Sequence, residues 1–242
     1  MIFIKKILKA IIYHINLKIL WRLIPYPIHK KFFKTDNAKS FENKYLYWDD
    51  IVDTLGKDEE VVFIELGVFQ GKSLKYFIKK FNNKSSTFFG LDSFKGLPED
   101  YGWFFKKKHF DTQEKIPNIN DNRVKFIKGL FQNTSEILLN QLQSIKTKNI
   151  LVHFDADLYT STLYCLTQLD RLSRDYYAFF DEFTGEESHA LCDYNRSFYS
   201  KFKIISHMSG GKHRDWHHGF PHKIFGKIIH RNSSNAHVAP KT

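Results

Sequence analysis

The chain has 242 residues, a formal net charge of +11 and 17% aromatic residues. That length suits a single α/β domain. Two cysteines without CxxC spacing indicate neither a disulfide framework nor a zinc site, so a reducing cytosol is the simplest compartment. The basic balance fits nucleic acid, an anionic membrane or an acidic substrate, but we favour a plain compositional bias toward Lys, Asn, Ile and Phe.

Residues 1–33 are apolar and basic. Their longest uncharged stretch, Ala10–Leu17, has eight residues, whereas a membrane span needs about 20, and the pattern of a signal peptide is missing. Two interpretations stay open: an amphipathic helix on a membrane surface, or helices covering the active-site mouth, which we favour. We predict a basic helical segment at 1–45, the main domain at 46–231 and a disordered tail at 232–242, with a cytoplasmic location.

Apolar runs alternate with helical patterns through the main domain. Strands are predicted at 61–66, 86–92, 124–128, 149–155, 176–182, 202–207 and 222–229, and helices at Lys72–Phe81, Ser135–Ser144, Ser161–Leu172 and Glu187–Tyr199. This alternation predicts βαβ units and a parallel sheet. The last two strands are joined without a helical pattern, which favours an antiparallel final strand. The predicted fold is therefore α/β, with a doubly wound, mostly parallel, seven-stranded sheet.

A glycine turn follows the first of these strands. Gly67 permits a tight turn, and Gly71 permits close approach of a ligand or helix. Their spacing is not that of dinucleotide binders, and no phosphate loop is present. The next strand ends in Asp92, where an acid in doubly wound folds accepts hydrogen bonds from a ribose diol. Together these features indicate an adenosine-type ligand without a pyrophosphate.

Two later strands end in carboxylates. Asp155 ends the run at 149–155, and Asp181 and Glu182 end the run at 176–182. Ligands of open α/β sheets bind beyond the carboxyl ends of the strands, so these acids are expected in one crevice. Unpaired, they would raise one another's pKa, and a hard cation such as Mg²⁺ would resolve that conflict. From these residues alone, simple helix capping is an equally good explanation.

Four stretches that follow one another along the chain resemble those of a known family: Glu65–Ser73, Gly90–Glu99, Lys128–Thr134 and His153–Thr162. The chain resembles the macrocin O-methyltransferase-like family of class I enzymes, which use S-adenosylmethionine (SAM). Asp181-Glu182-Phe183 stands where that family usually has Asp-Asp-Tyr. The matches lie between about residues 61 and 183, so the outer segments that shape the acceptor pocket are not covered.

The resemblance implies a SAM-dependent O-methyltransferase that acts on a hydroxyl of a sugar, glycan or secondary metabolite, assisted by a divalent cation, Mg²⁺. The SAM pocket is then expected to be lined by Glu65, Gly67, Gly71, Ser73, Asp92, Ser93, Gly129 and Phe131. The metal ligands are expected to be Asp155, Asp181 and Glu182, with Asp155 also the catalytic base. Asp157 is interpreted as a helix N-cap and His153 as a core histidine.

Two loops and two alternative functions remain. Residues 94–121 combine aromatic and lysine side chains, and we favour a lid over the cofactor rather than a surface for nucleobases. The His-rich residues 210–219 lack metal-ligand spacing. The first alternative function is nucleic-acid binding or methylation, which predicts lysines clustered on one face and strongly salt-dependent binding. The second is a non-catalytic SAM-fold module that serves as an interaction partner; it would tolerate loss of the strand-end carboxylates, and their presence argues against it. The acceptor and the oligomeric state stay open.

Overall fold

The computed structural model describes residues 33, 35, 37–101, 105–147, 149–183, 185–208 and 221–233. The predictions for the basic segment before residue 33, for the His-rich residues 210–219 and for the tail after residue 233 lie outside these ranges. Within them, no helix combines the length and apolarity that crossing a membrane requires. The described residues from 35 onward belong to one compact unit, and they hold the fold.

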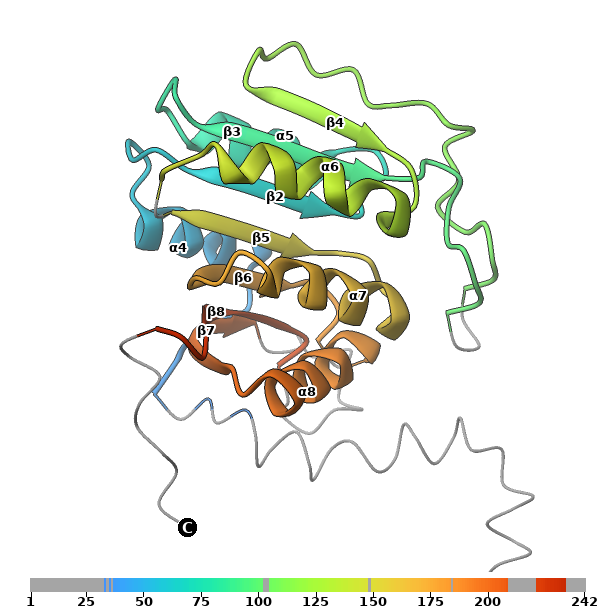
Figure 1. Ribbon diagram of the computed structural model, residues 1–242. Helices are drawn as coiled ribbons and strands as arrows, with labels where there is room; N and C mark the ends of the chain where they lie inside the picture. Colours follow the sequence, from blue (N-terminus) through green and yellow to red (C-terminus); the bar gives the residue numbers. More distant parts are fainter. Residues whose placement is uncertain are drawn as a thin grey trace, which may run out of the picture. The chain divides into compact units, whose positions relative to one another are not determined.

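An eight-stranded sheet lies at the centre of this unit, in the order β1-β7-β8-β6-β5-β2-β3-β4 (Figure 1). The strands are β1 (Lys39–Phe41), β2 (Val62–Leu66), β3 (Thr87–Asp92), β4 (Val124–Lys128), β5 (Ile150–Phe154), β6 (Tyr176–Phe180), β7 (Lys201–Met208) and β8 (Lys223–Ile229). Neighbouring strands are parallel except that β8 runs antiparallel to both β6 and β7. The predicted mostly parallel sheet with an antiparallel last strand is confirmed.

Helices cover both faces of the sheet. They are α4 (Lys44–Leu55), α5 (Lys72–Lys80), α6 (Phe131–Gln143), α7 (Tyr159–Asp170) and α8 (Glu186–Phe198). In Figure 1, α6, α7 and α8 lie in front of the sheet, while α4 and α5 lie behind it. The arrowheads of β2, β3, β4 and β5 point to the same edge, so the turns that follow these strands gather there.

Apolar strands buried on both faces explain why the sheet lies inside. Every residue of β2 and β5 is buried, as is typical of parallel strands with helices on either side. Behind the sheet, Phe63 stacks on Phe77 of α5, with ring centroids 4.9 Å apart. The ring centroids of Phe77 and Phe179 are 5.3 Å apart. Such aromatic pairs add to the burial of apolar surface, and they fix the strands whose ends carry the polar residues.

The sheet has one strand more than predicted, because residues 39–41 form β1 beside β7. Three residues are too few to show the alternation that reveals a strand. Helix α4 was also missed; it begins at Lys44 behind Asn43, whose side chain accepts hydrogen bonds from the N–H groups of Tyr45 and Leu46. This helix crosses the predicted boundary between residues 45 and 46.

Candidate functional site

Asp92, at the end of β3, holds the turns that follow β2 and β3. Its Oδ2 accepts hydrogen bonds from the N–H groups of Val68 and Phe69, both at 2.8 Å, and its Oδ1 accepts one from Phe94 at 2.7 Å. Phe69 and Phe94 both have a positive φ, which is a strained conformation for a bulky side chain. Three charge-assisted hydrogen bonds therefore hold two strained turns against one carboxylate.

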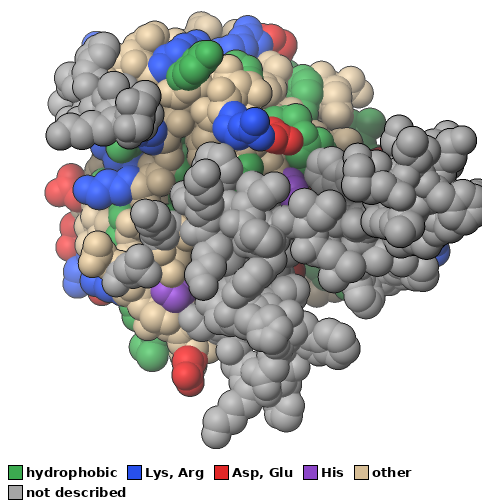
Figure 2. Space-filling view, turned by 90° about the horizontal axis from the view of Figure 1, so that it is seen from below, with side chains coloured by type: hydrophobic (Ala, Val, Ile, Leu, Met, Phe, Trp, Pro, Cys, Tyr) green, Lys and Arg blue, Asp and Glu red, His purple; other side chains and the backbone are tan. Residues whose placement is uncertain are grey.

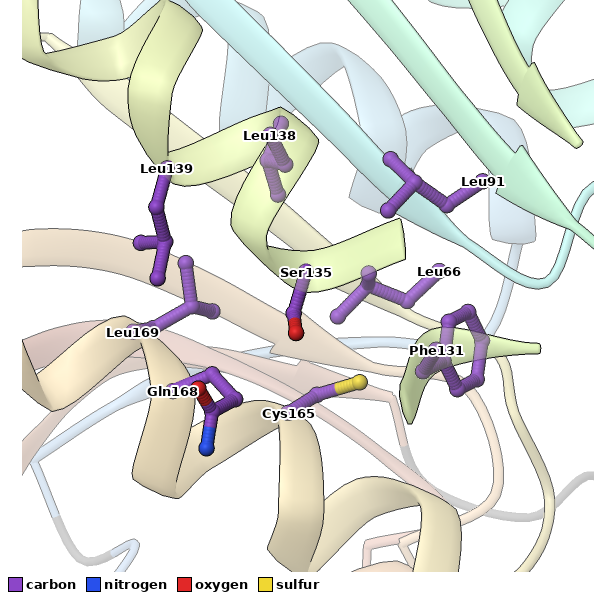
Figure 3. A pocket seen from close by; sticks show the side chains of 9 residues that line it. All are labelled: Leu66, Leu91, Phe131, Ser135, Leu138, Leu139, Cys165, Gln168 and Leu169. Carbon is purple, nitrogen blue, oxygen red and sulfur yellow. The ribbon is translucent and has the colours of Figure 1, made fainter. Parts of the chain in front are cut away.

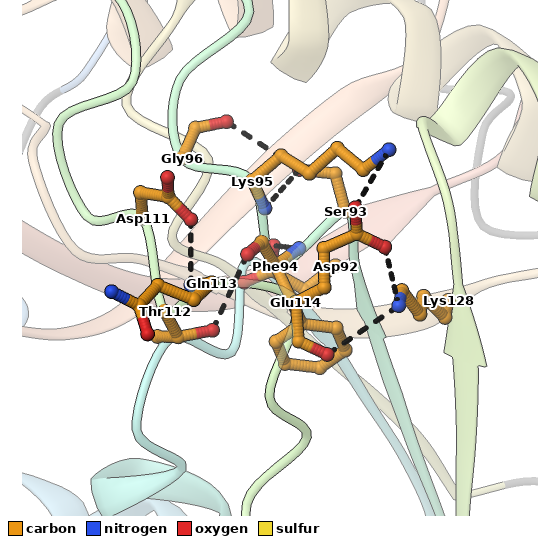
Figure 4. A network of polar contacts seen from close by, with 10 residues as sticks. All are labelled: Asp92, Ser93, Phe94, Lys95, Gly96, Asp111, Thr112, Gln113, Glu114 and Lys128. Carbon is orange, nitrogen blue, oxygen red and sulfur yellow. Dashed lines mark hydrogen bonds and ion pairs between the residues drawn. The ribbon is translucent and has the colours of Figure 1, made fainter.

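A second acid fastens the long loop to these turns (Figure 4). Glu114 lies 3.0 Å from the ammonium of Lys95 and 2.7 Å from that of Lys128. Its backbone N–H donates to the carbonyl of Phe94 at 2.8 Å, and Ser93 Oγ accepts from the N–H of Lys95 at 3.1 Å. The part of the predicted lid around Glu114 is thus anchored to the ends of β3 and β4.

Gly67 brings the glycine turn against the end of β5. Its φ is 93°, and a Cβ there would lie 2.0 Å from the carbonyl oxygen of Asp155, so only glycine fits this position. The backbone N–H of Asp155 also donates to the carbonyl of Leu66 at 3.0 Å. The turn predicted to bind the cofactor and the acid predicted to perform the chemistry are therefore in backbone contact.

The other residues predicted to line the SAM pocket lie around the same edge. Gly71, with φ 69°, caps α5, and Ser73 is buried in the first turn of that helix. Gly129 donates its N–H to the Asp92 carbonyl at 2.9 Å, and Phe131 begins α6. The structure thus gathers these four residues near the turns held by Asp92.

Two hollows lie near these turns. The pocket in Figure 3 is apolar and has a volume of about 20 Å³, room for about one water; it is lined by Leu66, Leu91, Phe131, Ser135, Leu138, Leu139, Cys165, Gln168 and Leu169. An open groove of about 440 Å³ runs beside the glycine turn between Phe69, Gln70 and residues 111–117. Ligand sites usually have volumes of about 300–1,000 Å³, so only the groove has the size of a ligand site.

The acid side of the site is centred on β5 and β6. His153, Asp155 and Asp181 each place a potential ligand atom within 4.8 Å of the others. His153 Nδ1 lies 2.9 Å from Glu65 Oε1, while Nε2 lies 3.7 Å from Asp181 Oδ1. Nε2 is fully buried and has no hydrogen-bond partner among the described residues. Glu65, predicted to bind SAM, is completely buried against His153; its contact with the cofactor stays a prediction.

Burial and close charges perturb this group strongly. Burial alone would lower the pKa of the His153 imidazole, but the flanking carboxylates of Asp181 and Glu65 outweigh it and raise that pKa to about 10. Burial also acts to raise the pKa of Asp181, yet His153 and Lys223 hold it well below its ordinary value. Burial, followed by the charge of Asp181, raises the pKa of Asp155 well above its ordinary value.

Lys223, at the start of β8, was missed by the sequence analysis. Its ammonium lies 2.6 Å from Asp181 Oδ2 and donates to the Asp181 carbonyl at 2.8 Å. Although charged, the residue is only 7% exposed. A lysine at the first position of an otherwise buried strand was the available signal, but the strand that faces it cannot be identified from periodicity.

Asp157, the neighbouring acid, does not have the role that we predicted for it. Leu158 occupies the N-cap of α7, and Glu186 accepts from the N–H of Tyr159 at 2.8 Å; the interpretation of Asp157 as the cap is therefore wrong. Asp157 instead has a positive φ of 59°. Burial, with the charges of Glu182 and Asp181, raises its pKa to about 7.

Glu182 does not belong to the close group of potential ligands, where His153 takes its place. Successive residues at a strand end point to opposite sides, and the backbone N–H of Glu182 donates to Glu187 Oε2 at 3.0 Å. Glu187 is fully buried, its Oε1 has no hydrogen-bond partner among the described residues, and burial raises its pKa well above the ordinary value. The role of Glu182 as a metal ligand stays a prediction.

The donor set fits a divalent cation through two carboxylates. Asp155 and Asp181 offer the oxygens that hard cations prefer, and the unpartnered Nε2 of His153 points to the same place. An imidazole can act as a ligand only when it is neutral, and Lys223 already holds one oxygen of Asp181. The carboxylates therefore suit a cation, but its binding has to compete with the contact of Lys223 with Asp181, and His153 can contribute only as a neutral imidazole.

The parallel sheet with its antiparallel β8, the glycine turn and the strand-end acid together define a SAM-dependent methyltransferase with a Rossmann-like fold. Residues 50–208 match the model of the family described as Macrocin-O-methyltransferase (TylF). The chain belongs to this family, as its motifs indicated, and is an O-methyltransferase by family.

Solved structures agree with this fold. CalS11, a calicheamicin methyltransferase, superposes with a TM-score of 0.53 at 16% identity, over 79% of this chain and 81% of its own. An apo structure of CalS11 is described as a TDP-rhamnose 3'-O-methyltransferase of calicheamicin biosynthesis. It has a TM-score of 0.47 and 17% sequence identity, over 79% of this chain and 82% of its own. At such identities the likeness concerns the fold alone. No curated protein shows significant sequence similarity to the chain.

Proposed function

We propose that this protein transfers the methyl group of SAM to a hydroxyl of a sugar, or of a glycan or secondary metabolite, assisted by a divalent cation. The observation that carries the proposal is the contact between Gly67 and the carbonyl of Asp155. Because of it, a methyl donor seated on the glycine turn would lie beside the buried acids. Transfer requires donor and acceptor to be held about 3 Å apart, and this juxtaposition supplies the positioning.

For the cofactor, we propose that Gly67, Gly71 and Asp92 form the centre of the SAM site. Asp92 accepts three backbone hydrogen bonds, but two carboxylate oxygens offer about four acceptor positions, so a ribose hydroxyl can still be accommodated. Ser73, Ser93, Gly129 and Phe131 would complete the walls. The groove beside Phe69 and Gln70 offers the neighbouring space.

For the chemistry, SAM supplies an electrophilic methyl group on a sulfonium. The attacking hydroxyl oxygen forms a bond to the methyl carbon while the carbon–sulfur bond breaks, and the hydroxyl proton must leave. Asp155 is our candidate for accepting that proton, since its raised pKa makes its ionised form a stronger base than an ordinary aspartate. Asp157, with a pKa of about 7, is a second carboxylate for this role.

For the metal, we propose that Asp155 and Asp181, with Glu182 nearby, hold a divalent cation such as Mg²⁺. Its contribution, when bound, would be to stabilise the negative charge that develops on the acceptor oxygen. Sugar and aliphatic hydroxyls have pKa values far above neutrality, so this assistance matters most for such acceptors.

For the acceptor, a sugar suits the aromatic wall beside the acids. Tyr101 stacks on Phe105 with ring centroids 6.0 Å apart, and Phe105 stacks on His109 at 4.3 Å. Burial and then the charge of Glu182 raise the pKa of Tyr101. A Cβ built on Gly185 would lie 2.8 Å from the Tyr101 hydroxyl and 3.6 Å from the carbonyl oxygen of Glu182, so the hydroxyl and Glu182 are neighbours. Flat aromatic faces suit the C–H faces of sugar rings.

The nucleic-acid alternative is less well supported. On the part of the surface that Figure 2 draws in colour, Lys and Arg side chains lie beside Asp and Glu side chains. Binding driven by phosphate contacts favours a surface that is mainly basic. The family match also concerns O-methyl transfer, which directs us to hydroxyl acceptors.

The proposal can be tested with SAM that carries a radiolabelled methyl group. The protein is incubated with nucleotide sugars, TDP-rhamnose among them, with glycosylated secondary metabolites and with RNA, each in Mg²⁺ and in EDTA. We expect label on a sugar hydroxyl in Mg²⁺ and much less in EDTA. Transfer only to RNA, or to nitrogen, would contradict the proposal, and undiminished sugar methylation in EDTA would remove only the metal from it.

A further inference from the structure

Lys223 occupies a position that the sheet fixes. In the antiparallel pairing of β8 with β6, Ile224 lies opposite Phe180, so the preceding Lys223 lies opposite the residue after Phe180, which is Asp181. The ammonium reaches both the side chain and the backbone carbonyl of Asp181, at 2.6 and 2.8 Å. Because Lys223 is only 7% exposed and makes both contacts, this ion pair is part of the folded interior and differs from an exposed surface pair.

Asp181 therefore lies between two basic side chains. Lys223 holds Oδ2, while His153 Nε2 lies 3.7 Å from Oδ1. The carboxyl group of Glu65 is buried, and those of Asp155 and Asp181 are partly buried. Basic side chains of the chain itself therefore lie beside this acid cluster. A buried charge without such a partner is costly, which explains why Asp181 can remain ionised inside the protein.

A divalent cation bound through Asp155 and Asp181 would share Asp181 with the ammonium of Lys223. Two cations at one partly buried carboxylate repel each other, because the effective dielectric constant there is lower than that of water. We propose that Lys223 is an internal counter-cation of Asp181 that competes with a divalent ion for this carboxylate and so weakens metal binding at the site. The inference rests on the proposed metal-assisted transfer, and the competition gives that site a lower affinity than its acids alone would.

The test compares Mn²⁺ binding by the wild type and by Lys223→Met, with free Mn²⁺ counted by electron paramagnetic resonance. Removal of the ammonium should tighten Mn²⁺ binding by about tenfold or more. Lys227→Met is the matched control, because Lys227 lies on the same strand but pairs with Asp175 at 3.3 Å. This control and the charge-preserving Lys223→Arg should both keep the wild-type affinity.

Stability supplies a second readout. Lys223→Met leaves Asp181 without its ion pair, so its melting temperature should fall in EDTA and recover with Mn²⁺, since a ligand that binds only the folded state stabilises it. If Lys223→Met does not fold, Lys223→Gln keeps a hydrogen-bond donor to Asp181 without the charge and replaces it in both measurements.

Equal or weaker Mn²⁺ binding by the uncharged Lys223 variants would overturn the competition. So would failure of every variant to bind Mn²⁺ at millimolar concentration. Neither result decides the proposed function, because methylation of sugar acceptors is measured separately in Mg²⁺ and in EDTA. A protein that methylates sugars in EDTA and never binds Mn²⁺ would keep its function while losing this inference.

Discussion

The two sides of the site are built by different means. On the cofactor side, after β2 and β3, the carboxylate of Asp92 is satisfied by backbone N–H groups. On the acid side, after β5 and β6, side chains neutralise one another, and His153 Nε2 and Glu65 Oε2 are left without hydrogen bonds among the described residues. Polar groups buried in this way cost stability, so the acid side has the character of a reactive site and the cofactor side that of a preformed cradle.

The strongest test of this difference is His153→Gln. The substitution removes the partner of the fully buried Glu65, and breaking a buried pair from one side costs about 3–5 kcal/mol. Urea denaturation measures the loss. The double variant Glu65→Gln/His153→Gln should regain a good part of it, because no buried charge is left unpaired. A loss below about 1 kcal/mol would mean that the acid side is more solvated than its burial indicates.

Gly67→Ala tests the contact between the cofactor side and the acid side, which Gly67 and the Asp155 carbonyl form. A left-handed backbone with a Cβ and a collision with the Asp155 carbonyl together cost about 2–5 kcal/mol. Gly56→Ala is the matched control: Gly56 also has a positive φ, 87°, but its Cβ would meet only the flexible side chain of Glu59. Equal losses of unfolding free energy in the two variants would show that the two sides do not press against each other.

Asp92→Ala tests the cofactor side, where this carboxylate holds the turns after β2 and β3. Loss of a charge-assisted hydrogen bond to the ribose should weaken SAM binding by roughly 1.5–3 kcal/mol, as measured by calorimetry, and the melting temperature should fall because the turns at Phe69 and Phe94 lose their acceptor. Asp58→Ala, which removes an exposed acid bonded to Asn82, should change neither. Unchanged SAM affinity in Asp92→Ala would remove this residue from the cofactor site.

Glu114→Gln is expected to have the smallest effect. Its two ion pairs with Lys95 and Lys128 are exposed, and exposed ion pairs contribute little to stability. The melting temperature should stay the same, while trypsin should cut more readily at the lysines of residues 106–108, because the loop loses an anchor. A drop in melting temperature of more than about 4 °C would show that the loop is part of the stable core.

The cofactor side was largely predictable because its signals are local in the sequence. A glycine turn directly after one strand and Asp92 at the end of the next were enough to predict that the two lie together, and the structure confirms this contact through Val68 and Phe69. The adenosine-type ligand stays a prediction. The strands were found for the same reason, since long apolar runs report buried parallel strands.

The acid side was predictable only in part, because its partners are far apart in the sequence. Glu65 and His153 are separated by 88 positions, and Asp181 and Lys223 by 42. The strand ends correctly indicated that Asp155 and Asp181 would meet. The place of His153 in that group, and the ion pair of Lys223, depend on strand order and register, which a single sequence does not specify.

The central claim is that the cofactor side binds SAM while the acid side performs the transfer, and Asp155→Asn tests it most directly. Asp155 approaches Gly67 through its backbone carbonyl, which the amide variant keeps, so this variant should leave the turns held by Asp92 intact. Measured side by side, calorimetry should show unchanged SAM affinity, and methyl transfer to the sugar acceptor should fall by about 10²–10⁴-fold. Full transfer activity in Asp155→Asn, or loss of SAM binding with it, would contradict the account.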